Sequence, residues 1–357
     1  MGPVAVVDSN AAGGTGAREI DSKPTLASII ASKDAAPGSD VVVSVDSDTA
    51  PALSSTNPGA GGELGGLEAD KEATAAVEVA APEADDQPFL TILRKNAEEN
   101  SGLLVITVVS SGDLKMTLNW VENLRHRDVS PFVFCIDAKM ALKMAKRKIP
   151  AALIPSEWLY EALEEWRNTT LETTDRNLIT HFKAPVLHYL TKHNFSVVYS
   201  DVDVAWVKSG LIPYLLKARA SHPKAFLFYT QQEELPPFDT YVSSGMYLSV
   251  PGVESVFFWG ALLEAQQEEK TLDQILFNVV LNDLGFRNTD ALVELEDCLF
   301  PDGFKYFREK GPCSKSLVPY TAQANSFPGR DAKERALRKK NLWFLRDDPS
   351  LDLASAT

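Results

Sequence analysis

Two aspartates stand between two apolar runs in the stretch that decides the fold, Phe195-Ser196-Val197-Val198-Tyr199-Ser200-Asp201-Val202-Asp203-Val204-Ala205-Trp206-Val207. The run at 195–199 is typical of a buried strand, and the acidic pair follows it directly. Burying two carboxylates among apolar neighbours is costly unless a cation pairs with them. Because no Lys or Arg lies between Lys192 and Lys208, we expect that partner to be a divalent cation, Mn²⁺ or Mg²⁺. The alternative is a solvated turn or a helix N-cap.

Outward from this stretch, apolar runs alternate with segments of helical periodicity. We expect strands at 103–109, 132–136, 149–154, 195–199, 225–229, 246–250, 292–295 and 316–319. Helices are expected at 114–124, 138–148, 174–193 with a kink at Pro185, 210–218, 253–269, 272–284 and 331–341, and an irregular excursion at 156–172. This order predicts an α/β fold with a mixed, mostly parallel sheet and helices on both faces. Such sheets bind ligands beyond the carboxyl ends of their strands, where Ser110-Ser111-Gly112 and Asp201-Val202-Asp203 both lie.

The N-terminal segment has a different composition from the rest of the chain. Residues 1–88 contain no Phe, Trp or Tyr, and they hold fifteen acidic and four basic residues of a chain whose net charge is −14. We predict a disordered, acidic, low-complexity tail at 1–87, a folded domain at 88–346 and a loose C-terminus at 347–357. The folded part is nearly neutral, so no nucleic-acid-binding face is expected.

Neither a membrane span nor a targeting pattern is visible in the chain. No run approaches the ~18 apolar residues of a transmembrane helix, and the N-terminus lacks the basic-then-apolar pattern of a signal peptide. Cys135 lies in an apolar run and is expected in the core. Cys298 and Cys313 are close enough in sequence for a disulfide, and two free thiols are an equally good interpretation.

Four motifs in order resemble the nucleotide-diphospho-sugar transferase domain of plants, algae and protists, which is placed in glycosyltransferase family 77. The resemblance covers residues 103–346. The motifs are the acidic run 199–206, Ser243-Ser244-Gly245-Met246-Tyr247, Asp273-Gln274-Ile275-Leu276-Phe277-Asn278, and a C-terminal region with Gln323-Ala324-Asn325, Gly329-Arg330 and Leu342-Trp343-Phe344. Two positions depart from the family pattern, because Gln323 stands where the family often has a metal-binding His and Ser243 where it has Asn. The resemblance implies a GT-A fold, a single Rossmann-like sheet.

The resemblance also implies roles for individual residues. It implies metal ligation by Asp201, Asp203 and Gln323, and catalysis with retention of configuration that is assisted by Asp273 and Gln274. Residues implied to bind the donor are Thr107, Ser110, Ser111, Asp137, Lys183, Asp201, Ser243, Ser244, Gly245, Arg330 and Lys333. Among these, Asp137 is expected to accept a hydrogen bond from uracil N3–H, the N–H groups of 243–245 to lie beside the sugar, and Arg330 and Lys333 to screen the leaving diphosphate.

Simpler interpretations remain for several of these residues. Asp273 can be an N-terminal charge on a helix dipole, Lys183 a solvated surface residue, and Arg330 and Lys333 part of a solvated basic helix face.

The resulting functional hypothesis is transfer of a sugar from a UDP-sugar donor to a hydroxyl on a glycan or protein. The resemblance implies the Golgi lumen as the compartment, and the absence of a visible anchor leaves the cytoplasm as the alternative. A phosphotransferase or nucleotidyltransferase is disfavoured because the chain has no Gly-rich phosphate loop. A non-catalytic sugar-nucleotide-binding protein of the same fold remains open because of Gln323.

Overall fold

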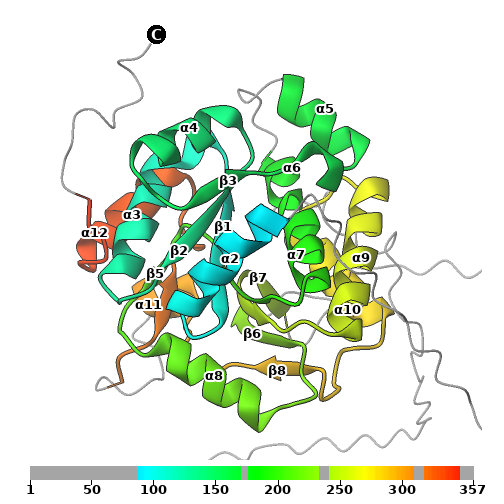
Figure 1. Ribbon diagram of the computed structural model, residues 1–357. Helices are drawn as coiled ribbons and strands as arrows, with labels where there is room; N and C mark the ends of the chain where they lie inside the picture. The colour runs from blue at the N-terminus through cyan, green and yellow to red at the C-terminus, as the bar shows by residue number, and fades with distance from the viewer. Residues whose placement is uncertain (1–86, 170–175, 233–240, 309–316, 346–357) are drawn as a thin grey trace, which may run out of the picture. The chain divides into compact units, whose positions relative to one another are not determined.

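Seven strands form the central sheet, in the order β3-β2-β1-β4-β7-β6-β8 (Figure 1). The computed structural model describes residues 87–169, 176–232, 241–308 and 317–345. In sheet order the strands are β3 (Ala151–Leu153), β2 (Pro131–Cys135), β1 (Leu103–Val109), β4 (Ser196–Ser200), β7 (Tyr241–Ser249), β6 (Leu227–Gln232) and β8 (Leu292–Glu294). The first four run parallel, β7 is antiparallel to both of its neighbours, and β6 and β8 are parallel. The predicted mixed, mostly parallel α/β sheet is therefore confirmed.

A two-stranded sheet lies directly after the acidic turn. It pairs β5 (Val204–Trp206) with β9 (Thr321–Gln323) in antiparallel register, so that Val204 lies opposite Gln323. This pairing brings a segment from the C-terminal part of the chain beside Asp203.

Helices cover both faces of the central sheet (Figure 1). The α-helices of the described residues are α2 (Gln87–Glu99), α3 (Leu114–Arg125), α4 (Ala138–Lys146), α5 (Glu161–Thr169), α6 (Arg176–His181), α7 (Lys183–Lys192), α8 (Leu211–Ser221), α9 (Val253–Glu268), α10 (Asp273–Asp283), α11 (Gly303–Phe307) and α12 (Arg330–Lys339). None of the described helices is both long enough and apolar enough to cross a membrane.

Alternation along β2 shows how the two faces are divided. Val133 belongs to the same core cluster as Leu118 of α3, whereas Phe132 and Phe134 contact Phe89 of α2 with ring centroids 6.4 Å apart. Successive side chains of a strand point to opposite faces, so α3 and α2 lie on opposite sides of the sheet. Both faces of β2 are buried, as a continuous apolar run predicts.

The helix expected at 174–193 is instead two helices. α6 ends at His181 and α7 begins at Lys183, so Pro185 falls in the first turn of α7 and not at a kink within one helix. A first-turn residue needs no intrahelical acceptor for its N–H, which proline lacks. The break before Lys183 lets this helix start beside the acidic turn.

Two other local predictions were wrong. The excursion at 156–172 contains α5, whose first turn carries Glu161 and Glu164 and whose last turn carries Arg167, charges that suit the helix dipole. The strand expected at 316–319 is not formed by the described residues 317–319, and β9 begins at Thr321. Pro319 cannot donate a ladder hydrogen bond, which explains the later start.

The cysteine predictions can be followed only in part. Cys135 is free and fully buried, and burial is the main cause that raises the pKa of its thiol to about 12. Cys298 is disulfide-bonded, and its candidate partner Cys313 lies outside the described residues. The predicted tail, apart from residue 87 in α2, and the predicted C-terminal segment 347–357 also lie outside them.

The side chain of Asn123 joins α3 to β5, the strand that follows the acidic turn. Its Nδ2 donates to the Trp206 carbonyl oxygen at 3.0 Å, its Oδ1 accepts from the Trp206 N–H at 2.6 Å, and the residue is fully buried. Asn123→Ala leaves both backbone groups without partners, so we expect the free energy of unfolding to fall by about 2–4 kcal/mol in urea denaturation. Asn282→Ala, which removes a bond to the neighbouring Asp283, should cost less than about 0.5 kcal/mol. Equal effects of the two variants would contradict the role of Asn123.

Candidate active site

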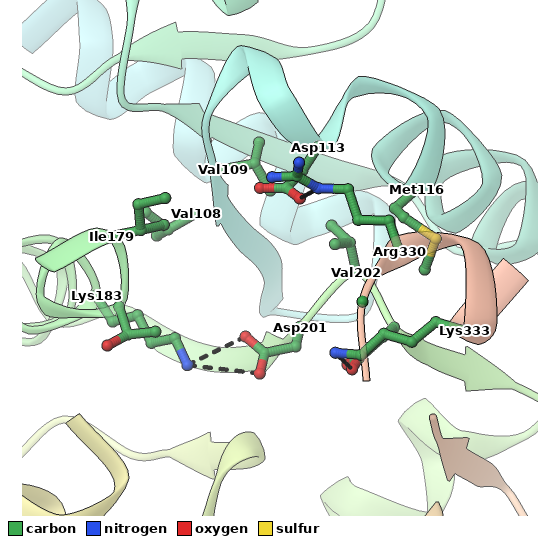
Figure 2. A pocket seen from close by; sticks show the side chains of 13 residues that line it. Val108, Val109, Asp113, Met116, Ile179, Lys183, Asp201, Val202, Arg330 and Lys333 are labelled. Atoms are coloured by element: carbon green, nitrogen blue, oxygen red, sulfur yellow. Dashed lines mark hydrogen bonds and ion pairs between the residues drawn. The ribbon is translucent and has the colours of Figure 1, made fainter. Parts of the chain in front are cut away.

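A cavity of about 220 Å³ lies at the carboxyl ends of β1 and β4 (Figure 2). It collects residues from the β1–α3 loop, the α6–α7 junction, the acidic turn and the start of α12. The lining residues are Val108, Val109, Asp113, Met116, Ile179, Thr180, Lys183, Asp201, Val202, Asp203, Gly329, Arg330 and Lys333. Three acidic and three basic side chains therefore meet in one cavity, at the edge of the sheet where α/β folds bind ligands.

Backbone hydrogen bonds fix the acidic turn on three sides. The Asp201 N–H donates to the Gly245 carbonyl oxygen at 2.8 Å, the Val204 N–H to that of Asp201 at 3.0 Å, and the Ala324 N–H to that of Asp203 at 2.9 Å. The turn is thus attached to β7 and to the residue after β9. These backbone bonds fix the positions of Asp201 and Asp203 at the cavity wall without using their carboxylate oxygens.

Lys183 lies between two carboxylates that are far apart in sequence. Its Nζ is 3.1 Å from Asp201 Oδ1, 3.0 Å from Asp273 Oδ2 and 3.2 Å from the Ser244 carbonyl oxygen. The residue is 7% exposed. Burial alone would lower the pKa of Lys183, but Asp201 and Asp273 together raise it above its usual value. Burial raises the pKa of Asp201, and the positive charge of Lys183 opposes that shift. The interpretation of Lys183 as a solvated surface residue is therefore wrong.

Asp203 pairs with a second lysine. Lys333 Nζ lies 2.6 Å from Asp203 Oδ2, and Asp203 is the largest cause that raises the pKa of Lys333. The acidic pair therefore has two basic neighbours in space, although none is near it in the sequence. Lys183 lies in α7 and Lys333 in α12. Both are outside the segment 192–208, so the composition of that segment gave no sign of them.

Gln323 and Ser243, the two departures from the family pattern, lie next to each other. Gln323 Nε2 donates to Asp203 Oδ1 at 3.3 Å, and Ser243 Oγ lies 3.5 Å from Gln323 Oε1. A Cβ atom on Gly245 would overlap the Gln323 side chain. Gly245 thus leaves the space that Gln323 uses to reach Asp203.

Tyr199 also contacts the acidic turn, a role that the sequence analysis did not predict. Its hydroxyl donates to Asp201 Oδ1 at 2.7 Å, and its ring stacks on Tyr247 with centroids 5.1 Å apart. Burial raises the pKa of Tyr199 well above its usual value, so the hydroxyl stays protonated and can donate. Residues two positions apart along a strand point to the same face, so the spacing of Tyr199 and Asp201 could have indicated this contact.

The amide of Gln274 is bonded to the backbone of β7. Its Oε1 accepts from the Ser244 N–H at 2.7 Å and its Nε2 donates to the Val242 carbonyl oxygen. The Gly245 N–H donates to Ser243 Oγ at 3.2 Å. Residues 243–245 lie inside β7 and not in a turn before it, and two of their N–H groups already have protein partners. Contacts of Gln274 and of these N–H groups with a donor sugar stay predictions.

Thr107, Ser111 and Asp137, which are expected to bind the donor, are all buried at or near the β1–α3 loop. Thr107 is fully buried within β1 and does not line the cavity. Asp137 caps α4 by accepting from the Met140 N–H at 2.8 Å, and its other oxygen accepts from the Ser111 N–H at 2.6 Å. Asp137 therefore shapes the loop that contains Ser110 and Ser111, and its contact with uracil stays a prediction.

Asp113 extends this loop into the cavity, and the sequence analysis did not single it out. Arg330 Nε lies 2.6 Å from Asp113 Oδ1. A Cβ atom on Gly112 would lie 3.0 Å from the Arg330 guanidinium. This ion pair joins the β1–α3 loop to the first turn of α12, and both residues line the cavity (Figure 2).

The chain is similar to a known sequence family and, at low identity, to solved glycosyltransferase structures. The sequence model of the nucleotide-diphospho-sugar transferase family matches residues 128–337, more than half of the chain. A crystal structure of the glycosyltransferase GlyE of Streptococcus pneumoniae TIGR4 has 12% sequence identity and a TM-score of 0.39, over 69% of this chain and 66% of that chain. Its apo form gives 12% and 0.38, over 68% and 64%. The chain thus covers slightly less than two thirds of these proteins, and no curated protein matches it. The finer placement in family 77 stays a prediction. The chain belongs to the nucleotide-diphospho-sugar transferase family.

Proposed function

We propose that this protein is a glycosyltransferase that moves a sugar from a UDP-sugar donor to a hydroxyl of a glycan or protein acceptor. The observation that carries this proposal is the convergence of Lys183, Arg330 and Lys333 with Asp201 and Asp203 around one cavity. Ammonium and guanidinium groups suit the oxygens of a diphosphate. Carboxylates suit ribose hydroxyls and a hard cation.

A divalent cation, Mn²⁺ or Mg²⁺, belongs to this proposal. The described residues contain no group of three or more His, Cys, Asp or Glu side chains that could hold a metal. The cation would instead be held by the carboxylates of Asp201 and Asp203 and the amide oxygen of Gln323. Asp113, the third carboxylate that lines the cavity, is paired with Arg330. Such a sparse set of oxygen ligands fits a cation that takes its remaining ligands from substrate phosphates. When bound, the cation would neutralise charge on the leaving nucleoside diphosphate.

The protein's own residues have distinct roles in this proposal. Arg330 and Lys333, in the first turn of α12, hold the diphosphate as its charge grows during departure. Lys183 lines the cavity and also pairs with Asp273, whose Oδ2 lies 3.0 Å from Lys183 Nζ. Asp273 and Gln274 would stabilise an oxocarbenium-like sugar. We propose retention of anomeric configuration, by a front-face route or a short-lived covalent adduct.

Ligand-induced stabilisation tests the proposed donor site. We expect UDP and Mn²⁺ together to raise the melting temperature by roughly 5 °C or more at 100-fold excess over Kd, because a ligand that binds only the native state stabilises it by about 2.7 kcal/mol there. Either ligand alone should give a smaller shift. The measurement is differential scanning fluorimetry with UDP, Mn²⁺, both or neither.

Absence of any shift with UDP and Mn²⁺ would sink the proposed function. A shift without Mn²⁺-dependent hydrolysis or transfer of any UDP-sugar would favour the non-catalytic sugar-nucleotide-binding alternative, which Gln323 at the third ligand position keeps open.

A further inference from the structure

The carboxylate best placed to hold the cation already has a positive partner. Asp203 is 5% exposed, and its two oxygens contact Lys333 Nζ at 2.6 Å and Gln323 Nε2 at 3.3 Å. A cation that approaches Asp203 Oδ2 meets the ammonium group first. Two positive charges cannot both occupy this position at short range without strong repulsion.

The Lys333 side chain is less tightly held in place than that of Lys183. The Lys183 side chain is 9% exposed and contacts three oxygen-bearing groups, whereas the Lys333 side chain is 28% exposed and Asp203 is the one ion-pair partner recorded for it among the described residues. Lys333 lines the cavity on a four-carbon stem that begins in the first turn of α12 (Figure 2). A phosphate in the cavity would offer this ammonium a second anionic partner within reach.

We propose that Lys333 is an internal counter-ion that competes with the divalent cation for Asp203 until a diphosphate draws it away. The protein then binds the cation tightly only together with a nucleoside diphosphate. This inference rests on the proposed function, and it adds an order of assembly to it. Cation and diphosphate become coupled through Lys333 as well as through direct contact, and the coupling is reciprocal.

Mn²⁺ binding without nucleotide distinguishes this arrangement from a lysine that only binds phosphate. In Lys333→Met we expect Mn²⁺ alone to bind at least about tenfold more tightly than in the wild type, equivalent to about 1.4 kcal/mol. The ratio of Mn²⁺ affinities with and without UDP should fall by a similar factor. The readout is free Mn²⁺ measured by electron paramagnetic resonance during titration, with and without saturating UDP.

Two matched variants control for charge and position. Lys333→Arg keeps the positive charge and should behave like the wild type. Lys339→Met removes one exposed charge from the same helix, and its Mn²⁺ affinity should change by less than about twofold because exposed charges are screened. Circular dichroism establishes that each variant is folded.

The outcomes separate this inference from the proposed function. If Mn²⁺ alone binds Lys333→Met no more tightly than the wild type, while the wild type binds Mn²⁺ with UDP, the counter-ion role is wrong and the donor site stands. If the wild type does not bind Mn²⁺ even with UDP, the proposed cation site itself fails. Tightening in Lys339→Met equal to that in Lys333→Met would also overturn the specific role of Lys333.

Discussion

Asp203→Asn is expected to reduce sugar transfer from a UDP-sugar by at least about a thousandfold. The substitution keeps the size of the side chain but removes the negative charge at the centre of the proposed cation site. A single electrostatic contact to a developing oxyanion is worth about a hundredfold to a thousandfold in catalysis, and loss of the cation removes several such contacts. The measurement is steady-state release of UDP over a range of Mn²⁺ concentrations.

Asp113→Asn is the matched control for this prediction. Asp113 lines the same cavity, and its partner Arg330 is 52% exposed at the side chain. Removing this charge should lower turnover by less than about tenfold, because the ion pair is largely screened by solvent. If Asp203→Asn retains more than a tenth of the wild-type turnover, Asp203 does not hold the cation.

The central strands were predictable from the sequence because burial on both faces leaves a continuous apolar run. The segment 103–109 is such a run, and every residue of β1 is buried. Short elements with mixed composition were not predictable in this way. α5 was missed because Trp158, Tyr160 and Trp166 in a polar context gave no clear helical period. The break between α6 and α7 depends on where Pro185 falls relative to a helix start, which periodicity alone does not fix.

The acidic turn and the cluster around it were predictable as types of residue, but their pairing was not. Asp201, Asp203, Lys183, Arg330 and Lys333 all line one cavity, and their binding of donor or metal stays a prediction. Their partners are decided by tertiary contacts between distant segments, such as Lys333 with Asp203. Neighbouring sequence therefore predicts a metal as the partner of the two carboxylates, whereas in the structure two lysines are paired with them.

Local hydrogen bonds give Asp137 a structural role that the sequence did not reveal. Each of its two carboxylate oxygens accepts a backbone N–H, and its contact with uracil stays a prediction. An Asp that caps a helix and one that faces a ligand have the same sequence context, since each follows a strand. The hydrogen bond from the Ser111 N–H depends on the path of the β1–α3 loop, which the sequence around Asp137 does not contain.

Lys183→Met is expected to lower the free energy of unfolding by about 3–5 kcal/mol. The substitution leaves two carboxylates without their shared cation, and Asp273, whose side chain is 8% exposed, is the more deeply buried of them. Breaking a buried ion pair from one side costs this much because the remaining charge stays desolvated. Urea denaturation at pH 8 measures the loss. Lys192→Met, an exposed position in the last turn of the same helix, should cost less than about 0.5 kcal/mol.

The dependence of this loss on pH and on Asp273 identifies its cause. Burial already raises the pKa of Asp201 in the wild type, and removal of Lys183 should raise it further. A carboxyl group with a raised folded-state pKa binds its proton more tightly in the folded protein, so stability is gained as the pH falls through that pKa. The loss of stability in Lys183→Met should therefore shrink between pH 8 and pH 5.

Adding Asp273→Asn to Lys183→Met should recover at least half of the lost stability, since the uncompensated charge is removed. A penalty that is independent of pH and additive with Asp273→Asn would mean that Lys183 stabilises the fold by packing, and the charge bridge from Asp201 to Asp273 would be wrong.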